Sequence, residues 1–372
     1  MDKLKIGLLT PPIGAASLIP LSNLLAILLA QFQFIHLITG NEGYSVFKNV
    51  SRINCLEIKH TNEPHSYLRV LKYFYLQVRI SISFIKIINK SDIWIFFLGG
   101  ENLVIPMITG KIFKKKMVLL FSGSSVHTHY YDRFVNYLKI LTDINCTFSD
   151  RIILYSQNLV NEYNLTPYRH KILIAHRHFL DFTTFTVTTP FSERPPLIGY
   201  IGRLSAEKGV QHFVQALPAI LSEQQDLRVL IGGDGQLKES ITASLDAEKI
   251  SNHVDLPGWI SHDDLPNYLN QLRLLVLPSY TEGLPNIMLE AMACVTPVLA
   301  TPVGAIPDVI RDGETGFIME DNSPECIARN VLRALHDPDL EGVAERGRRF
   351  VEVEFTFEKA VERWRGILED IE

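Results

Sequence analysis

Cysteine is scarce in this chain, and its placement argues against a disulfide framework or a zinc-binding motif. The 372 residues include four cysteines, and no two of them form a C-x-x-C pair. Structural zinc sites are typically built from closely spaced ligands, and a disulfide framework is typical of short, cysteine-rich chains. The widely spaced Cys55, Cys146, Cys294 and Cys326 therefore favour a protein of a reducing compartment.

Long apolar runs are also missing. The most apolar early run, residues 24–30, is too short to cross a bilayer. The run at residues 93–110 is interrupted by Glu101, Asn102 and Pro106. The N-terminal sequence leads directly into a strand and turn pattern, and it does not have the form of a secretory signal. We expect a cytoplasmic protein, with peripheral attachment to the inner face of the cell membrane as the alternative.

The common glycine motifs for dinucleotides and ATP are absent. Gly232, Gly233 and Gly235 follow an apolar run, but their spacing is not G-x-G-x-x-G and no Walker lysine accompanies them. The chain holds 36 Lys and Arg against 41 Asp and Glu, a net charge of -5, and no nucleic-acid-binding motif. We therefore expect no nucleic acid partner.

The chain divides into a basic half and an acidic half. Residues 1–190 hold 20 Lys and Arg against 11 Asp and Glu, whereas residues 191–372 hold 16 against 30. A length of 372 residues favours two domains. The Pro-rich stretch 190–196 is the expected linker, so the sequence predicts an N-terminal domain over 1–190 and a C-terminal domain over 191–355.

Both halves alternate short apolar runs with helical patterns. Examples of the expected strands are KIGLLT, IWIFFLG and MVLLFSG in the first half, and LIGYIG, LRVLIGG and LRLLVLP in the second. Strands that alternate with helices pair in parallel and form a sheet covered on both faces. The predicted fold class is therefore α/β, with two doubly wound domains. In such sheets ligands bind beyond the carboxyl ends of the strands.

The most informative segment spans residues 278–300 and holds two glutamates eight positions apart. Leu277 ends an apolar run typical of a buried strand, and Asn286 is a favourable N-cap for the helix predicted after it. Glu282 is then expected in the loop and Glu290 one turn inside the helix. The helix start suits a phosphate and the carboxylates suit sugar hydroxyls. Alternatively, the first is an ordinary loop acid and the second a solvated helix acid.

Two cations precede another predicted helix, in the string GYIGRLSAEKGVQHFVQAL at residues 199–217. Arg203 and Lys208 follow an expected strand and lie five positions apart. An arginine fork and a lysine point charge beside a helix start can hold a diphosphate. The other interpretation is a solvated loop.

Both segments resemble signature elements of the retaining, nucleotide-sugar-dependent glycosyltransferases of family 4 (glycosyl transferases group 1). EGLPNIMLEAMACVTPV resembles the E-x7-E motif nearly residue by residue, with Val295 where the family usually has glycine. G-R-L-x-x-E-K-G resembles the donor-diphosphate element. The resemblance is strong over 197–320 and weak over 1–190. It implies the GT-B fold, with two Rossmann-like domains facing a cleft and a C-terminal helix at 356–372 that crosses back to the first domain.

The resemblance also implies roles for the charged residues. Arg203 and Lys208 would stabilise the leaving nucleoside diphosphate, Glu282 would hold the sugar and its phosphate, and Glu290 would hold the ribose hydroxyls. Fixed cations stabilise the charge that develops on the leaving group, so neither a metal nor another cofactor is expected. The expected donor-binding residues are Gly14, Gly202, Arg203, Lys208, Trp259, Ile260, Glu282, Gly283, Leu284, Pro285, Asn286 and Glu290.

Three of these assignments rest on position in the family pattern. Gly14 follows the first expected strand, where family members approach the donor phosphate closely. Trp259 and Ile260 stand where family members bind the nucleotide base, although the tryptophan would serve equally as a surface aromatic.

Departures from the family pattern concern the acceptor side. The histidine that many relatives carry near the reacting end of the sugar falls on Ser122 or Gly123 by register. His127 lies farther along and is the candidate catalytic residue there, with an ordinary loop histidine as the alternative. His178 replaces part of the usual Pro-Asn-Gly. With His176 it suggests a metal ligand pair, but no carboxylate or cysteine partner has the right spacing.

A basic, aromatic and apolar segment starts at Ser66 and ends at Lys90. Arg69, Lys72 and Arg79 are interspersed among its apolar residues. A basic amphipathic helix is typical of binding to an anionic membrane surface. The alternative is a core helix with solvated charges.

We therefore predict a retaining, metal-independent glycosyltransferase that moves a sugar from a UDP- or GDP-linked donor to an acceptor hydroxyl. The expected setting is polysaccharide, glycolipid or glycoconjugate biosynthesis, with an acceptor sugar or lipid-linked glycan as the partner. Two alternatives remain from the sequence. One is a GT-B epimerase or hydrolase that acts on a nucleotide sugar, and the other is a catalytically silent nucleotide-sugar-binding protein.

Overall fold

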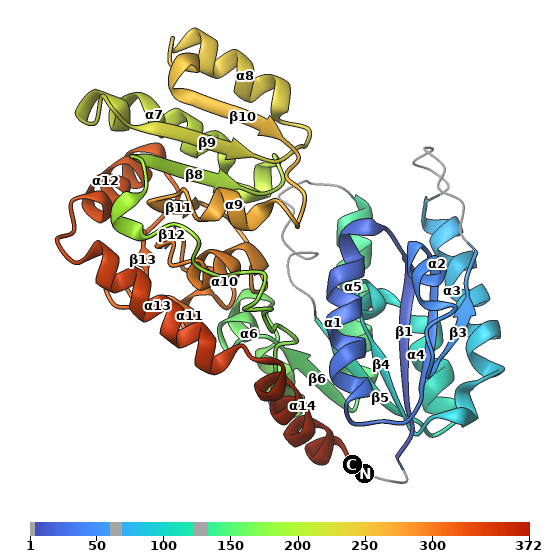
Figure 1. Ribbon diagram of the computed structural model, residues 1–372. Coiled ribbons are helices and arrows are strands. Elements are labelled where there is room, and N and C mark those ends of the chain that lie inside the picture. The colour runs from blue at the N-terminus through green and yellow to red at the C-terminus, as the bar shows by residue number, and fades with distance from the viewer. Residues whose placement is uncertain (1–3, 60–68, 122–132) are drawn as a thin grey trace. The chain divides into compact units, whose positions relative to one another are not determined.

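The computed structural model describes residues 4–59, 69–121 and 133–372 (Figure 1). The chain forms two compact units. The first holds Met1–Arg177 together with Ala360–Glu372, and the second holds His178–Lys359. His127 and the residues at 122–123 lie outside the described residues, as do residues 66–68 of the expected amphipathic segment.

The first unit is built on a seven-stranded parallel sheet with the order β3-β2-β1-β4-β5-β6-β7. Its strands are β1 Ile6–Ile13, β2 Ile35–Asn41, β3 Ile53–Glu57, β4 Ile93–Phe96, β5 Lys116–Leu120, β6 Arg151–Leu154 and β7 Ile172–Ile174. Its helices are α1 Leu18–Leu29, α2 Glu42–Phe47, α3 Arg69–Ile85, α4 Val104–Ile112, α5 Arg133–Phe148 and α6 Asn158–Glu162. The last helix, α14 Phe357–Ile371, contributes residues 360–371 to this unit.

The second unit is built on a six-stranded parallel sheet with the order β10-β9-β8-β11-β12-β13. Its strands are β8 Leu197–Ile201, β9 Arg228–Gly232, β10 Val254–Gly258, β11 Leu274–Leu277, β12 Val298–Ala300 and β13 Phe317–Ile318. Its helices are α7 Val210–Glu223, α8 Lys238–Ala247, α9 Leu265–Leu269, α10 Asn286–Ala293, α11 Ile306–Val309, α12 Pro324–Leu335 and α13 Leu340–Glu354.

These sheets confirm the predicted fold class of two doubly wound, Rossmann-like domains. Each sheet reverses its strand order beside its first strand, which is the arrangement that places ligands beyond the carboxyl ends of the strands. The central strands are continuous apolar runs because both faces of a parallel sheet are covered by helices. All four residues of β4 and all four of β11 are buried.

The Pro-rich stretch that the sequence marked as a linker is anchored within the second unit. Arg194 is 3% exposed. It donates from Nη1 to the carbonyl of Leu272 at 3.0 Å and from Nη2 to the carbonyl of Cys294 at 2.6 Å. Residues before this stretch are also held by the second unit, because the N–H of Thr188 donates to Oδ1 of Asn270 at 2.8 Å. The compact units divide between Arg177 and His178, whereas the expected domains divide between residues 190 and 191.

Among the described residues, none of the helices is long and apolar enough to cross a membrane. α3, which covers most of the basic amphipathic segment, is a helix of 17 residues. Its buried side chains include Leu76, Ile80 and Phe84, and α3 packs against α4.

Candidate functional site

The first element of the site is the loop between β11 and α10, which holds Glu282. The carboxylate is nearly covered, since the residue is 7% exposed. Its Oε1 lies 2.6 Å from Nζ of Lys208, and the hydroxyl of Ser279 donates to the same oxygen at 2.7 Å. The structure therefore joins two residues that the sequence assigned to different parts of one ligand site.

Glycines on two other loops fix the backbone around Glu282. Gly209 has φ +67°, and a Cβ there would lie 1.9 Å from the carbonyl oxygen of Pro278. Gly304 has φ +61°, and a Cβ there would lie 2.2 Å from the carbonyl oxygen of Glu282. Because only glycine combines this conformation with such close approach, the β8–α7, β11–α10 and β12–α11 connections are packed together at one end of the sheet.

The start of α10 corrects one detail of the sequence analysis. Pro285 is the N-cap and Asn286 is the first helical residue, whereas Asn286 was expected to be the cap. No side chain caps this end. A proline in extended conformation enters the helix here, so the cap position shifts by one residue. The N–H groups of the first turn have no partner within the helix and point out of its end, which suits an anion.

Glu290 lies on α10 and is also nearly buried, at 7% exposed. Its Oε1 lies 3.4 Å from Nε2 of His262, whose side chain is about half exposed. The hydrogen bond to Glu290 raises the pKa of His262 above its ordinary value, although partial burial opposes this. Phe185 packs edge-on against the imidazole with ring centroids 5.2 Å apart.

Sequence reasoning missed His262. The histidine stands two residues after Ile260 in the string WISHDDL, directly beside the expected base-binding position. That proximity was the available signal.

Arg203 occupies the loop after β8 and is exposed, with 63% of its side chain accessible. Its Nη1 lies 3.3 Å from Oε1 of Glu207, which also accepts from the hydroxyl of Ser205 at 2.7 Å. The Arg203 carbonyl accepts from the hydroxyl of Tyr200 at 2.7 Å. The loop backbone is thus fixed while the guanidinium stays accessible. Within the described residues, no ion pair joins this guanidinium to either predicted glutamate.

The loop of Arg203 is joined directly to the loop of Glu282. The N–H of Tyr280 donates to the carbonyl of Glu207 at 3.0 Å. Glu207 precedes Lys208, the last residue of the short 3-10 helix Ala206–Lys208. This bond holds the two loops together beside the Lys208–Glu282 ion pair.

Close backbone packing continues toward β10. Gly233 has φ +135°, and a Cβ there would lie 1.9 Å from the carbonyl oxygen of Gly202. Its N–H donates to the carbonyl of Gly258 at 2.7 Å. The residues that follow are Trp259, which is 79% exposed, and Ile260, which is half-buried. Every donor-binding residue expected in this unit therefore lies beyond the carboxyl end of a strand.

In the first unit, Gly14 follows β1 directly. Its φ is -93° and its ψ is 177°, and a Cβ placed on it would meet no described heavy atom within 4 Å. Packing within the unit does not require glycine at this position, and the backbone there is open to solvent.

Near the unit boundary, His178 is 1% exposed and Arg177 donates from Nε to the hydroxyl of Tyr155 at 3.0 Å. This segment is part of the packed interior. Among the described residues, no group of three His, Cys, Asp or Glu side chains is arranged to hold a metal ion.

The comparisons with solved structures extend over both units. HepE of Anabaena in complex with UDP has a TM-score of 0.77 and 16% sequence identity, and the match covers 99% of this chain and all of that one. Sucrose-phosphate synthase of Thermosynechococcus elongatus has a TM-score of 0.76 and 17% identity, with 99% of each chain covered. These likenesses show that the fold is shared.

The sequence comparisons concentrate on the second unit. Alpha-D-kanosaminyltransferase of Streptomyces kanamyceticus is 30% identical over 177 residues, which are 47% of this chain and 46% of that protein. The capsular polysaccharide biosynthesis glycosyltransferase CapM of Staphylococcus aureus is 31% identical over 161 residues, which are 43% and 42% of the two chains. The chain thus spans about half the length of the curated relatives it matches. Residues 181–350 match the family model described as glycosyl transferases group 1. This segment, which carries the Lys208–Glu282 pair and Glu290, is similar to the glycosyl transferases group 1 family.

Proposed function

We propose that the protein is a retaining glycosyltransferase that moves a sugar from a nucleoside-diphosphate sugar to an acceptor hydroxyl. The observation that carries this proposal is the largely covered ion pair of Lys208 and Glu282 at the carboxyl edge of the sheet. A cation for phosphate and a carboxylate for hydroxyls are held together within one family segment. The relatives named above support the same class of reaction.

Lys208 and Arg203 are proposed to hold the diphosphate. Lys208 is paired with Glu282 at 2.6 Å in this structure. A bound diphosphate competes for the ammonium, and Glu282 then accepts hydrogen bonds from the sugar hydroxyls while keeping that of Ser279. Arg203 needs little rearrangement because its guanidinium is already exposed. Both cations stabilise the charge that appears on the leaving diphosphate, so no metal is required.

The N–H groups at the start of α10 are proposed to bind phosphate oxygens. The backbone of Gly283, Leu284 and Asn286, turned by Pro285, faces the sugar and its phosphate in this proposal. The close packing of Gly304 against the Glu282 carbonyl supports a backbone that is formed before the ligand arrives. Such preorganisation favours the transition state because little reorganisation is needed.

Glu290 is proposed to accept hydrogen bonds from both ribose hydroxyls. Its carboxylate oxygens suit a pair of adjacent donors. Nε2 of His262 lies 3.4 Å from one of these oxygens, Oε1, and so orients the carboxylate. Trp259 and Ile260 are proposed to lie against the base, with contacts from the neighbouring backbone, and Gly202 permits close approach of the diphosphate.

The reaction itself exchanges two bonds at the anomeric carbon. The acceptor oxygen bonds to that carbon while the bond to the diphosphate oxygen breaks, and the acceptor proton passes to the leaving phosphate on the same face. Gly14 is proposed to let the backbone of the first unit approach the donor phosphate, and His127 to serve the acceptor side. Neither the bond exchange nor the proton transfer uses a metal or another cofactor in this proposal.

The donor nucleotide is proposed to be UDP or GDP. The HepE structures are described with UDP and with UDP-glucose. A relative from Corynebacterium glutamicum, 27% identical over 209 residues, is named a GDP-mannose-dependent mannosyltransferase. A thermal-shift screen over UDP-, GDP- and ADP-sugars identifies the donor. Turnover is then followed with and without acceptors of the polysaccharide and glycolipid classes.

Three outcomes separate the candidate functions. Sugar transfer that requires an acceptor supports the proposal. Turnover without an acceptor identifies the hydrolase or epimerase. Nucleotide binding without release of sugar, across all acceptors tried, identifies a silent binding protein and rejects the proposal.

We further propose that the protein binds peripherally to the cytoplasmic face of an anionic membrane through α3, where a lipid-linked acceptor would be found. The helix buries one face against its own unit but exposes apolar side chains at helical spacing. Leu71, Phe74, Tyr75, Ile82 and Ile85 are between 48% and 66% exposed. Lys72, Arg79 and Lys86 recur every seven residues beside this stripe, which suits anionic headgroups.

A further inference from the structure

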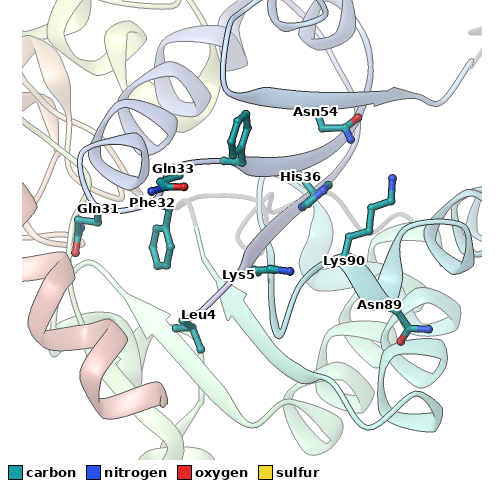
Figure 2. A pocket seen from close by; sticks show the side chains of 10 residues that line it. Leu4, Lys5, Gln31, Phe32, Gln33, His36, Asn54, Asn89 and Lys90 are labelled. Carbon is teal, nitrogen blue, oxygen red and sulfur yellow. The ribbon is translucent and has the colours of Figure 1, made fainter. Parts of the chain in front are cut away.

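A pocket at the opposite end of the first unit's sheet takes no part in the proposed reaction. It has a volume of about 550 Å³ and is lined by Leu4, Lys5, Gln31, Phe32, Gln33, Phe34, His36, Asn54, Asn89 and Lys90 (Figure 2). A volume of this size suits a small organic ligand. Gly14, by contrast, follows the carboxyl end of β1.

The pocket is assembled from the amino ends of four neighbouring strands. Lys5 directly precedes β1, His36 is the second residue of β2, and Asn54 is the second residue of β3. Lys90 ends the 3-10 helix Ile88–Lys90 before β4. β1 has eight residues and therefore seven steps, so at about 3.3 Å per residue its first and last residues are about 23 Å apart. The pocket therefore lies at the other end of the sheet from Gly14, the residue of this unit that is proposed to approach the donor.

The pocket carries positive charge, and none of the described residues that line it is acidic. Figure 2 shows the side chains of Lys5, His36 and Lys90 around one part of the pocket, with Asn54 beside them. Among the described residues, neither lysine ammonium lies within ion-pair distance of a carboxylate. The nearby Asp92 carboxylate instead accepts from the backbone N–H of Lys5 at 3.0 Å.

One further cation fixes the wall of the pocket. Arg52 donates from Nε to the carbonyl of Gln33 at 2.9 Å and from Nη2 to the carbonyl of Leu29 at 2.7 Å. These bonds hold the turn between α1 and β2, so the wall is formed without a ligand. The guanidinium adds positive charge close to the lining residues.

The pKa of His36 is affected by these neighbouring charges. Burial, followed by the charges of Lys90 and Lys5, lowers the pKa of His36. Its Nδ1 is 3.2 Å from the hydroxyl of Ser91, which fixes the ring orientation. An anion in the pocket would offset the repulsion from the two lysines.

We propose that this pocket binds a small phosphomonoester that carries a compact apolar group. The two ammonium groups, the imidazole and the side-chain amides supply donors for a dianion. Phe34, which is 62% exposed, and Leu4 supply an apolar surface beside them. The proposal stands on this pocket alone and does not depend on sugar transfer.

The test uses phenyl phosphate, inorganic phosphate and neutral benzyl alcohol as probes of the full chain. Affinities are measured by calorimetry, and the site is identified from the ring resonances of His36, assigned with His36→Asn. Phenyl phosphate is expected to bind and to shift those resonances. The double variant Lys5→Gln with Lys90→Gln is expected to weaken binding at least about tenfold, because it removes two charge-assisted contacts.

The matched control is Lys114→Gln with Lys139→Gln, which removes the same charge from exposed positions of the same unit outside the pocket lining. Equal weakening by the control, or His36 resonances that do not move, would overturn the proposal. If benzyl alcohol binds as tightly as phenyl phosphate, the site does not select an anion. If inorganic phosphate binds as tightly as phenyl phosphate, the proposed contact with an apolar group is wrong.

Discussion

Nζ of Lys208 lies 2.6 Å from Oε1 of Glu282, although the two residues are 74 positions apart in the chain. Both side chains are mostly covered, with 24% and 10% of their surfaces exposed. Such a pair is costly to break from one side only, because the remaining charge is left without a partner. The same pair is proposed to open when a donor binds, so its stability and its function are coupled.

Lys208→Ala is therefore expected to reduce both turnover and the free energy of unfolding. The stability loss should be about 1–3 kcal/mol, below the range for fully buried pairs because the lysine is partly solvated. Adding Glu282→Gln removes the unpaired charge and should restore much of that stability without restoring turnover. Urea unfolding and donor turnover of the single and double variants measure the two effects. Normal turnover in Lys208→Ala would contradict the diphosphate role.

Unlike Lys208→Ala, Arg203→Ala is expected to reduce turnover while leaving the free energy of unfolding nearly unchanged. The side chain is 63% exposed, and its ion pair with Glu207 within the described residues is a surface pair. Its loss should change the free energy of unfolding by less than about 0.5 kcal/mol. Turnover should fall by about 10²-fold if the guanidinium stabilises the leaving group. Arg311→Ala, which removes a similarly exposed arginine paired with Glu314, is the matched control and should retain turnover.

The pairing of His262 with Glu290 predicts a pH dependence. The carboxylate raises the pKa of His262, so protonation of the imidazole is stronger in the folded state than in the unfolded one. The stabilisation is fully present below the unfolded pKa of about 6.5 and is lost as pH rises through the higher folded pKa. Wild type should lose its advantage in Tm over His262→Gln across that interval, and Glu290→Gln should lower the His262 pKa measured by NMR.

The sequence predicted the structural features that depend on neighbouring residues, and it missed those that depend on contacts between residues far apart in the chain. The strands of both sheets are apolar runs whose burial is local, so the fold class followed from them. The Lys208–Glu282 contact joins two motifs and was implied only as a shared ligand site. His262 was missed because its contact with Glu290 joins residues 28 positions apart, and its nearness to Ile260 alone gave it no role. The pocket around Lys5, His36 and Lys90 was missed because its residues lie at or before the amino ends of four strands that are far apart in the chain.

Gly14→Ala tests whether a ligand approaches the backbone after β1. A Cβ there meets no described atom within 4 Å, and φ of -93° is accessible to alanine. The free energy of unfolding should therefore change by less than about 0.5 kcal/mol. A fall in donor affinity or turnover would then come from the ligand and not from the fold. Gly233→Ala is the contrasting variant, because its Cβ would clash with the Gly202 carbonyl at 1.9 Å and should unfold the loop.

The exposed stripe of α3 predicts binding to anionic membranes. Leu71, Phe74 and Ile82 are each more than half exposed, so replacing Leu71 and Phe74 by serine should leave the fold intact. In a flotation assay with vesicles that contain phosphatidylserine, the wild type should float with the vesicles and this variant should not. Both insertion of apolar side chains and attraction to the headgroups are needed for binding. Lys72→Gln with Lys86→Gln should weaken binding and reduce its salt dependence. Ile112→Ser, at an exposed apolar residue on α4, is the control and should bind normally. Wild type that fails to float with anionic vesicles would leave α3 as a helix with a solvated apolar face and reject the membrane proposal.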